Sequence, residues 1–207
     1  MRPRDPSIPF AMRSSALQPI ESVGRRAIAS VKAVGSAGYL SGDAARALKK
    51  VDLWWPHLLP QMVAVGVASV PIALFIATFT GIVLALQSSY TFTGAVPIYF
   101  VGTLVGKTMI LELGPVLTGL ALSGRVGANI AAELGTMRVT EQVDALETLA
   151  YDPVAYLVVP RVIAGALMFP VVVMLANAVG IVAGWGTSLY LLDMSTPEFM
   201  KGLRLFF

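Results

Sequence analysis

The sequence predicts an all-α protein that crosses a membrane several times. Of its 207 residues, 56% are hydrophobic and 13% are charged, whereas about a quarter of the residues in an ordinary soluble domain are charged. The mean hydropathy is +0.75, and no Asp, Glu, Lys or Arg occurs between Leu53 and Gly106. Because one spanning helix needs roughly 20 apolar residues, the length allows one membrane domain with about three spans and no separate catalytic domain.

Residues 1–52 are predicted to form a basic segment on the cytoplasmic side of the membrane. The segment has no apolar core of the kind found in a cleaved signal peptide. Up to Asp52 it carries nine Lys or Arg and four acidic residues. The positive-inside rule places such a segment, and with it the N-terminus, in the cytoplasm.

Two helices are predicted within this segment. From Gln18 to about Gly38 apolar residues recur at helical spacing, which indicates an amphipathic helix lying in the membrane surface. A soluble helix that packs on a partner is the alternative. A second short helix is predicted to start near Ser41 or Asp43 and to reach Trp54 and Trp55, which mark the membrane interface.

The first span is predicted to run from about Gln61 to Gln87. Pro71 lies inside it and predicts a kink, because proline removes a helical hydrogen bond. The polar cluster at residues 87–94 then predicts a turn on the outer side of the membrane.

The second and third spans are predicted further along the chain. The second runs from about Val96 to about Ala132, and its length, with Gly114 and Pro115 near the middle, predicts a tilted or broken helix. The third is the uncharged run at residues 162–192. With the N-terminus inside, the third span ends outside.

Residues 102–115, GTLVGKTMILELGP, contain the Gly-Lys-Thr that ends a phosphate-binding P-loop. A P-loop has four residues between its first glycine and the Gly-Lys pair, but only three separate Gly102 from Gly106. A P-loop also follows a strand in a soluble domain, whereas these residues lie in an apolar stretch. No nucleotide cofactor is expected on this chain, and no metal site either, because cysteine is absent and His57 is the only histidine.

Lys107, Glu112 and Arg125 are charged residues inside the predicted second span. On insertion scales a charge at a helix centre costs about 2.5–3.5 kcal/mol unless it faces a cavity or a partner. Five residues on a helix amount to about 140° of rotation, so Lys107 and Glu112 are poorly placed to pair with each other. Glu112 therefore needs another partner, water or a polar ligand; an ion pair with a basic residue of another helix is the structural alternative.

Small residues recur at helical spacing in the second and third spans, and such rows let helices approach closely. Packing within the bundle is one interpretation, and packing against a second copy of the chain is the other. The rows are Gly124, Ala128 and Ala132; Gly127, Ala131 and Gly135; and Gly180 with Gly184. Gly124, Arg125, Gly127 and Ala128 are the candidate helix-packing residues.

Residues 133–149 are predicted to form one polar helix in the cytoplasm between the second and third spans. Apolar residues face one side of it and acidic residues the rest. The stretch has no nucleophile and base pair and no metal-binding cluster, so it does not indicate an enzyme. Exposed apolar and acidic side chains on a short helix suit docking into a groove of a soluble partner; a solvated loop helix is the alternative.

Several short motifs follow one another along the chain, namely Glu-Leu-Gly-Pro (112–115), Gly-Arg-Val-Gly (124–127), Ala-Glu-Leu-Gly-Thr-Met-Arg-Val-Thr-Glu-Gln (132–142), Asp-Ala-Leu (144–146), Asp-Pro (152–153) and Pro-Arg (160–161). Together they resemble the MlaE/YrbE permeases, the membrane subunits of ABC transporters that move phospholipids and related lipids between bacterial membranes. The resemblance covers roughly residues 53–192 and implies a permease domain over residues 53–207.

The resemblance implies a non-catalytic homodimer in the bacterial inner membrane that sits on two copies of a separate ATPase. ATP and Mg²⁺ would bind that ATPase. A periplasmic MCE-domain protein and a STAS-domain protein are further implied partners, lipid is the implied substrate, and nucleic acid is not a partner. Residues 133–149 correspond to the coupling helix, with Glu133, Met137, Arg138, Glu141, Gln142, Asp144 and Leu146 as its candidate ATPase-coupling residues.

By the same resemblance, Glu112 corresponds to a glutamate that lines the lipid cavity, with Leu111 and Pro115 beside it. Many relatives carry Arg directly before that glutamate, so Leu111 implies different headgroup recognition. The family has five spans where this chain offers three, and residues 202–207 have the pattern of the start of another element. A non-functional truncated permease and a proton-coupled secondary transporter using Glu112 are the alternatives, whereas an intramembrane enzyme is disfavoured.

Overall fold

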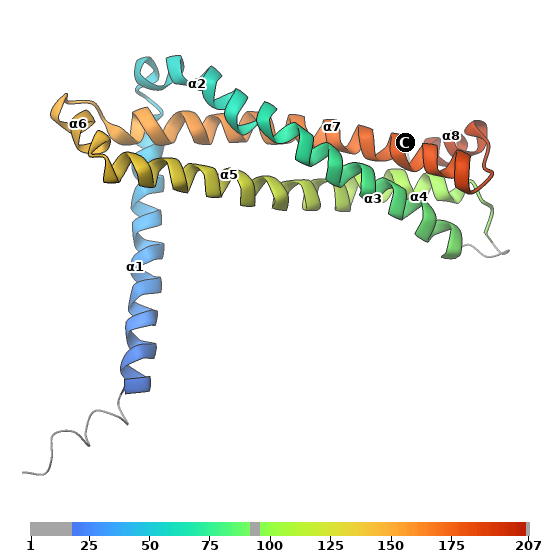
Figure 1. Cartoon of the computed structure of the whole chain (residues 1–207), viewed down its shortest axis with the longest axis horizontal. Coiled ribbons are helices and arrows are strands. Elements are labelled where there is room, and N and C mark those ends of the chain that lie inside the picture. The colour runs from blue at the N-terminus through green and yellow to red at the C-terminus, as the bar shows by residue number, and fades with distance from the viewer. Residues whose placement is uncertain (1–17, 92–95, 206–207) are drawn as a thin grey trace, which may run out of the picture. The chain divides into compact units, whose positions relative to one another are not determined.

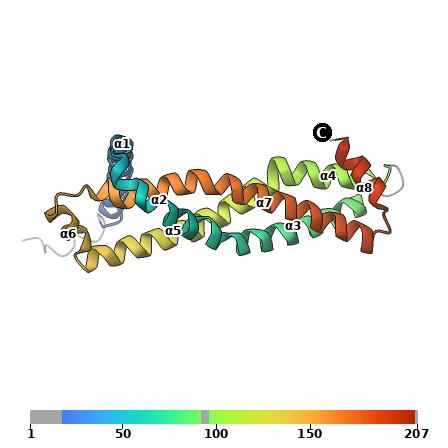
Figure 2. The same ribbon diagram turned by 90° about the horizontal axis from the view of Figure 1, so that it is seen from above.

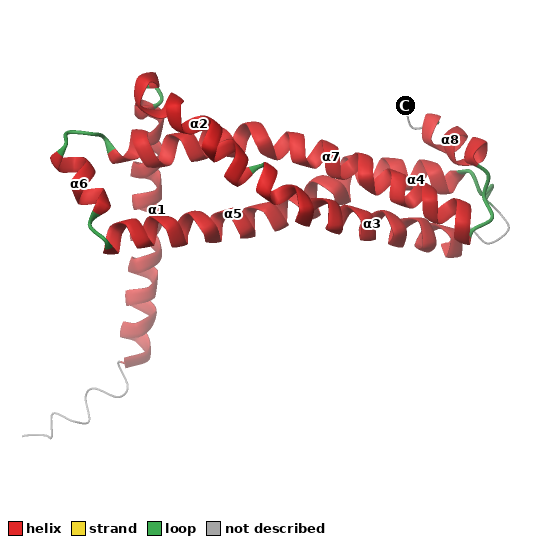
Figure 3. Cartoon of the chain, turned by 45° about the horizontal axis from the view of Figure 1, so that its top comes forward, coloured by secondary structure: helices red, strands yellow, loops and turns green. Residues whose placement is uncertain are grey.

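The computed structural model describes residues 18–91 and 96–205. Their secondary structure is helical, with short connecting loops and no strand in these ranges, as Figure 3 shows. The chain separates into two units, residues 1–49 and residues 50–207. The predicted all-α class is confirmed.

The described part of the first unit is one helix, α1 (Gln18–Ala47), shown in blue in Figure 1. The prediction of a second helix beginning near Ser41 or Asp43 is wrong. The Ser41 hydroxyl donates to the carbonyl of Ala37 over 2.7 Å, so it bonds back into the helix instead of capping a new one. The glycines at 35, 38 and 42 do not interrupt the helix.

The first candidate span covers Val51–Thr91. It consists of α2 (Val51–Val65), a 3₁₀ turn η2 (Val67–Ser69) and α3 (Val70–Thr91). Pro71 is the second residue of α3, just after the 3₁₀ turn, so the helical path is irregular before the proline. The predicted kink at Pro71 stays a prediction. The span begins before the predicted Gln61.

Residues 87–91, the start of the predicted outer turn, are the last residues of α3. A turn beginning at residue 87 is therefore wrong. Residues 92–95 of the predicted turn lie outside the described residues.

The second candidate span, Phe100–Val139, is one continuous helical path. It contains α4 (Phe100–Thr108), a π-helical turn η3 (Met109–Leu113) and α5 (Gly114–Val139). The Gly114 N–H donates to the carbonyl of Met109, five residues earlier. The interruption predicted at residues 114–115 is thus a widened turn just before them, and the helix is not broken.

The third candidate span, Val154–Leu191, confirms the last predicted crossing. It begins with a π-helical turn η4 (Val154–Val158) and continues as α7 (Val159–Leu191). A short helix α8 (Thr196–Arg204) follows. Residues 202–204 are the last turn of α8, so the interpretation that they begin another element is wrong for them; residues 206 and 207 lie outside the described residues.

The row Gly180 and Gly184 packs inside the bundle, where α3 runs along α7 (Figure 2). A Cβ on Gly81 of α3 would collide with the carbonyl oxygen of Gly180. Gly81 belongs to a buried row of small residues on α3, namely Ala73, Ala77, Gly81, Ala85 and Ser88. For this row the packing prediction is confirmed, because only small side chains allow backbones to come this close.

The two glycines that resemble those of a P-loop, Gly102 and Gly106, have a role in helix packing. Gly102 and Gly106 lie inside α4, which packs against α8. A Cβ on Gly102 would collide with the carbonyl oxygen of Phe199, and one on Gly106 with the side chain of Leu203. The Gly-Lys-Thr sequence is therefore part of a helix and not of a loop after a strand.

Candidate functional site

Glu112 lies in the π-helical turn η3 inside the second span, and its side chain is exposed. Neither Glu112 nor Lys107 forms an ion pair with any residue that the structure describes. Leu111, beside it, is 57% exposed, and Pro115 is half-buried. The carboxylate therefore projects from a membrane-spanning helix without a partner in the described chain.

The π-helical turn and the residue after it pack closely against α7, where Met109 lies beside Gly180 and Gly114 beside Asn177. A Cβ on Gly114 would collide with Oδ1 of Asn177, so only glycine leaves room for this carboxamide. Asn177 Oδ1 is buried and accepts no hydrogen bond within the described residues. π-helical turns are frequent at functional sites. Because a neighbouring helix holds this turn, the turn fixes the position of the Glu112 side chain on the span.

One side of α5 is open, and we call it the open face of α5. It continues from Glu112 through Val116, Leu120, Gly124, Gly127, Ala131 and Gly135, which are exposed or half-buried. A Cβ on Gly124, Gly127 or Gly135 would meet nothing within 4 Å. Packing against the residues that the structure describes therefore does not account for Gly124, Gly127 or Gly135, and packing of these rows against a second copy of the chain stays a prediction.

Arg125 connects α5 to the turn in the first span. Its Nη1 donates to Ser69 Oγ over 2.6 Å, and the Ser69 hydroxyl donates in turn to the carbonyl of Val65 over 2.7 Å. The guanidinium thus holds α5 beside the 3₁₀ turn η2. The structure gives this candidate helix-packing residue a contact between helices, whereas Gly124, Gly127 and Ala128 have an exposed position.

The prediction of one helix over residues 133–149 is wrong. Residues 133–139 are the end of α5, and α6 (Gln142–Thr148) is a separate short helix. The chain turns between them at Glu141, whose φ is +58°, a left-handed conformation that does not continue a helix. Arg138 and Asp144 form an ion pair of 3.6 Å across this turn.

The turn brings several of the candidate coupling residues together. Met137 of α5 and Gln142 and Leu146 of α6 line a hollow of about 380 Å³. Tyr156 and Leu157 of η4 form part of its wall. Glu133 lies apart from this group, because its carboxylate is paired with Arg161 of α7.

A loop contact fixes the chain between α6 and α7. The Asp152 carboxylate accepts a hydrogen bond from Lys50 Nζ over 2.8 Å and another from the Val154 N–H over 3.0 Å. The Lys50 bond lowers the pKa of Asp152, burial opposes it, and the backbone N–H groups of Ala155 and Val154 lower the pKa further. Nearby, the rings of His57 and Tyr156 lie 4.3 Å apart.

The helical arrangement agrees with the comparisons with known proteins. The family described as Permease MlaE matches residues 58–207, nearly all of the second unit. The chain belongs to the MlaE permease family. It is therefore a multi-pass membrane protein and a non-catalytic permease subunit of the ABC-transporter type.

Named relatives of this MlaE-family chain come from bacteria and a plant. A "probable ABC transporter permease protein" of Rickettsia felis is 41% identical over 86% of this chain and 69% of its own length. The "intermembrane phospholipid transport system permease protein MlaE" of Haemophilus influenzae is 36% identical over 84% and 66%. The chloroplastic protein "TRIGALACTOSYLDIACYLGLYCEROL 1" of Arabidopsis thaliana is 34% identical over 70% and 41%.

Two contacts of this MlaE-family chain were missed by reasoning from the residues. The first is the ion pair between Arg161 Nη2 and Glu133 Oε1, 2.7 Å apart, in which Arg161 is only 4% exposed. The second is the contact of Gly114 with Asn177. Both join different helices, and helical periodicity reports which face a residue occupies but not which neighbour it meets. The only signal was the presence of Glu133, Arg161 and Gly114 in family motifs.

Proposed function

We propose that this chain is the membrane-spanning subunit of an ABC transporter that moves phospholipids or related lipids between membranes. The observation that carries the proposal is Glu112, an exposed carboxylate in a π-helical turn inside a span that forms no ion pair with any residue the structure describes. Such a group costs free energy in lipid unless a cavity or polar ligand receives it. The name of the Haemophilus influenzae relative supports a phospholipid as that ligand.

The open face of α5 supports a homodimer. Its small residues offer a surface on which a second helix can approach closely, and Glu112 would then lie at the edge of a cavity between two copies. Leu111 and Pro115 would line the same cavity. Leu111 in place of a basic residue makes the wall apolar there.

The turn between α5 and α6 supports contact with the ATPase. Arg138, Glu141, Gln142 and Asp144 are exposed, while Met137 and Leu146 line the hollow beside them. A short helix with apolar and acidic side chains suits a groove on a soluble protein. In this mechanism ATP and Mg²⁺ bind the partner ATPase, and hydrolysis moves α6 and opens or closes the cavity between the two copies.

The rest of the proposed assembly follows from family membership. The chain would lie in the bacterial inner membrane with its N-terminus in the cytoplasm, α1 in the membrane surface, an MCE-domain protein on the outer side and a STAS-domain protein on the ATPase. Co-purification with the products of neighbouring genes, followed by mass spectrometry of bound protein and lipid, tests this. A chain that emerges alone and lipid-free would contradict the assembly and favour a truncated, non-functional permease.

The role of Glu112 is tested by Glu112→Gln, with Glu147→Gln of α6 as the matched control. Loss of one charged hydrogen bond is expected to lower crosslinking of lipid beside Glu112 about tenfold, with ATPase binding retained. The control is expected to leave lipid crosslinking unchanged. Unchanged crosslinking in Glu112→Gln would make Glu112 structural, and transport that continues without the ATPase would favour a proton-coupled secondary transporter.

A further inference from the structure

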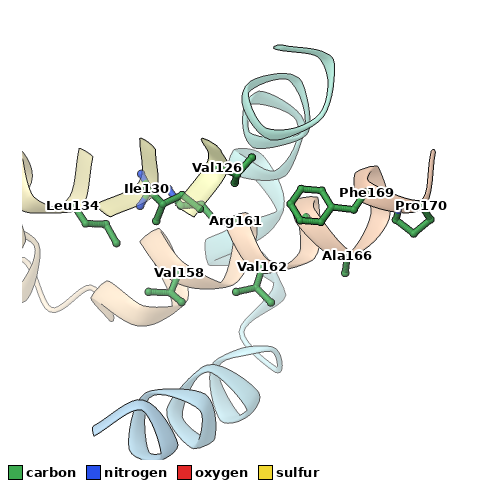
Figure 4. Close-up of a pocket in the computed structure, with 10 residues that line it drawn as sticks. Val126, Ile130, Leu134, Val158, Arg161, Val162, Ala166, Phe169 and Pro170 are labelled. Carbon is green, nitrogen blue, oxygen red and sulfur yellow. The ribbon is translucent and has the colours of Figure 1, made fainter. Parts of the chain in front are cut away.

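A cavity of about 520 Å³ lies between α5 and the first half of α7. Val126, Ile130 and Leu134 form its α5 wall, and Val162 belongs to its α7 wall (Figure 4). Each of these α5 residues lies one position before a residue of the open face, which is about 100° around a helix. Val126, the lining residue nearest to Glu112 in the sequence, lies about 21 Å further along the helix. The cavity is therefore separate from Glu112.

The size and lining of this cavity suit one acyl chain. From Val158 to Pro170 it follows α7 for about 18 Å at 1.5 Å per residue, close to the roughly 15 Å of hydrocarbon in one leaflet. Its volume lies within the range of about 300–1,000 Å³ typical of ligand pockets. Val162 is 60% exposed and Ala166 is exposed as well, so the cavity is accessible from the side of the span.

Arg161 is the one polar side chain among the described residues that line the cavity. It is 4% exposed, and its Nη2 lies 2.7 Å from Oε1 of Glu133. Its Nε and Nη1 are buried and have no hydrogen-bond partner within the described residues. Figure 4 shows the side chain extending from α7 toward α5. Buried charged donors without acceptors are costly, so this end of the cavity favours an additional anionic group.

The carboxylate of Glu133 marks the route by which an anion reaches Arg161. Glu133 is half-exposed, so the guanidinium edge that it occupies is the edge nearest to the surface. A phosphate can accept two parallel hydrogen bonds from one guanidinium. A phosphate replacing Glu133 would therefore keep the bond to Nη2 and add an acceptor for Nη1.

We propose that this cavity binds one anionic phospholipid, with its phosphate on Arg161 in place of Glu133 and an acyl chain along Val162. The lipid would belong to the leaflet at the α6 end of the spans. The inference rests on the proposed function only in that the chain must lie in a bilayer. It goes beyond that function because binding here requires neither the ATPase nor the surface around Glu112.

The experiment places the photo-crosslinking residue p-benzoylphenylalanine at Val162 of the full chain in phosphatidylcholine vesicles. Radiolabelled phosphatidylglycerol, which is anionic, and radiolabelled phosphatidylcholine are compared as probes. We expect preferential crosslinking of phosphatidylglycerol, and a loss of this preference of about tenfold in Arg161→Met. In Glu133→Gln the preference is expected to rise, because the competing carboxylate is gone.

The opposite effects of these two substitutions separate lipid binding from a merely structural ion pair. If Arg161→Met and Glu133→Gln reduce crosslinking equally, the pair only joins α5 to α7 and the proposal fails. Equal crosslinking of both lipids in the chain that carries only the crosslinker at Val162 would also overturn the proposal. Crosslinks to protein instead of lipid would overturn it as well.

Two further variants distinguish a loss of lipid binding from misfolding of the chain. Arg161→Lys retains the charge and is expected to retain part of the preference for phosphatidylglycerol. Arg204→Met removes an exposed arginine of α8 outside the cavity, and is expected to leave the preference unchanged. A loss of preference in Arg204→Met equal to that in Arg161→Met would overturn the proposal. A negative crosslinking result at Val162 would not contradict the proposal that the chain is a lipid permease, because that proposal is tested at Glu112 and by co-purification of the ATPase.

Discussion

The charged side chains inside the spans have different kinds of partner. Arg125 donates a hydrogen bond to Ser69, and Arg161 forms an ion pair with Glu133. These two charged side chains therefore have partners on other helical segments of the same chain. Glu112 forms no ion pair with any described residue. Since each charge within lipid requires a partner or a cavity, the partner of Glu112 is to be sought outside the described residues.

Asp152 is expected to stabilise the fold in a pH-dependent way. Its pKa is lowered by Lys50, and a carboxyl with a lowered folded pKa stabilises the protein above its unfolded pKa and loses that effect as the pH falls through the folded value. Asp152→Asn should therefore lower the thermal midpoint in detergent at neutral pH. The loss should be below about 1 kcal/mol, because the ion pair is partly exposed.

The same measurement at acid pH provides the check. Below about pH 4 the unfolded carboxyl is protonated, and the difference between Asp152→Asn and the unmodified protein should shrink. Lys50→Met should show a similar loss at neutral pH, since it removes the same bond. A difference that is equally large at neutral and acid pH would contradict the assignment.

Single elements could be predicted where hydropathy alone decides. The three spans follow from long apolar runs, because no other structure satisfies every backbone polar group within lipid. Helix ends were less predictable. Ser41 has the residue type of an N-cap, yet in α1 its hydroxyl bonds back to Ala37, and the same residue type serves both purposes.

The division of residues 133–149 into two helices could not be predicted from periodicity. The apolar spacing continues across Thr140 and Glu141, although the chain changes direction there. Its cause is the left-handed conformation of Glu141, and no glycine or asparagine at this position announces it. Glu141 therefore has two properties to test, its charge and its backbone conformation.

Substitutions at Glu141 can separate these two properties. Glu141→Lys and Asp144→Lys are expected to abolish co-purification with the ATPase, because they reverse the charge of the docking surface. Glu141→Gly removes the charge but adopts the left-handed conformation readily, so it should raise chain stability by up to about 1 kcal/mol while weakening ATPase binding only in part. Wild-type co-purification in both charge-reversal variants would refute the docking role.

At the scale of the whole molecule, the small residues serve two different surfaces. Gly81 packs on Gly180 within the chain, whereas Gly127 on the open face of α5 meets no atom within 4 Å of an added Cβ. Gly127→Leu is therefore expected to leave the thermal midpoint of the single chain nearly unchanged and to disrupt the proposed homodimer. Gly81→Leu should instead destabilise the chain by at least about 1–3 kcal/mol through overpacking.

Mass measurement of the detergent-solubilised protein distinguishes these outcomes. Gly127→Leu should shift the population from dimer to monomer. Gly186→Leu is a matched control, because its added Cβ also meets nothing within 4 Å and Gly186 belongs to α7, not to the open face of α5. A dimer that survives in Gly127→Leu would exclude this face as the interface.

The candidate site was predictable only in part, because it is assembled from several helices. Motif residues placed Glu112 in the second span, and its exposure is as expected for a residue that faces a cavity. By contrast, the contacts of Arg161 with Glu133 and of Gly102 with Phe199 join residues distant in the sequence. Helical periodicity does not indicate which residues of different helices form such pairs, so these contacts are known only from the packing of the bundle.

The π-helical turn at residues 109–113 has a consequence for how the gene can change. A π-helical turn contains about one residue more than an α-helical turn. It therefore corresponds to the insertion of a single codon into the coding sequence of an otherwise regular helix. Deleting that codon would rotate everything before it by about 100° relative to α5. Gly102 and Gly106 would turn away from α8 while Gly127 kept its position. A deletion of three nucleotides would thus change the orientation of α4 relative to α5 by a rotation that a single substitution does not produce.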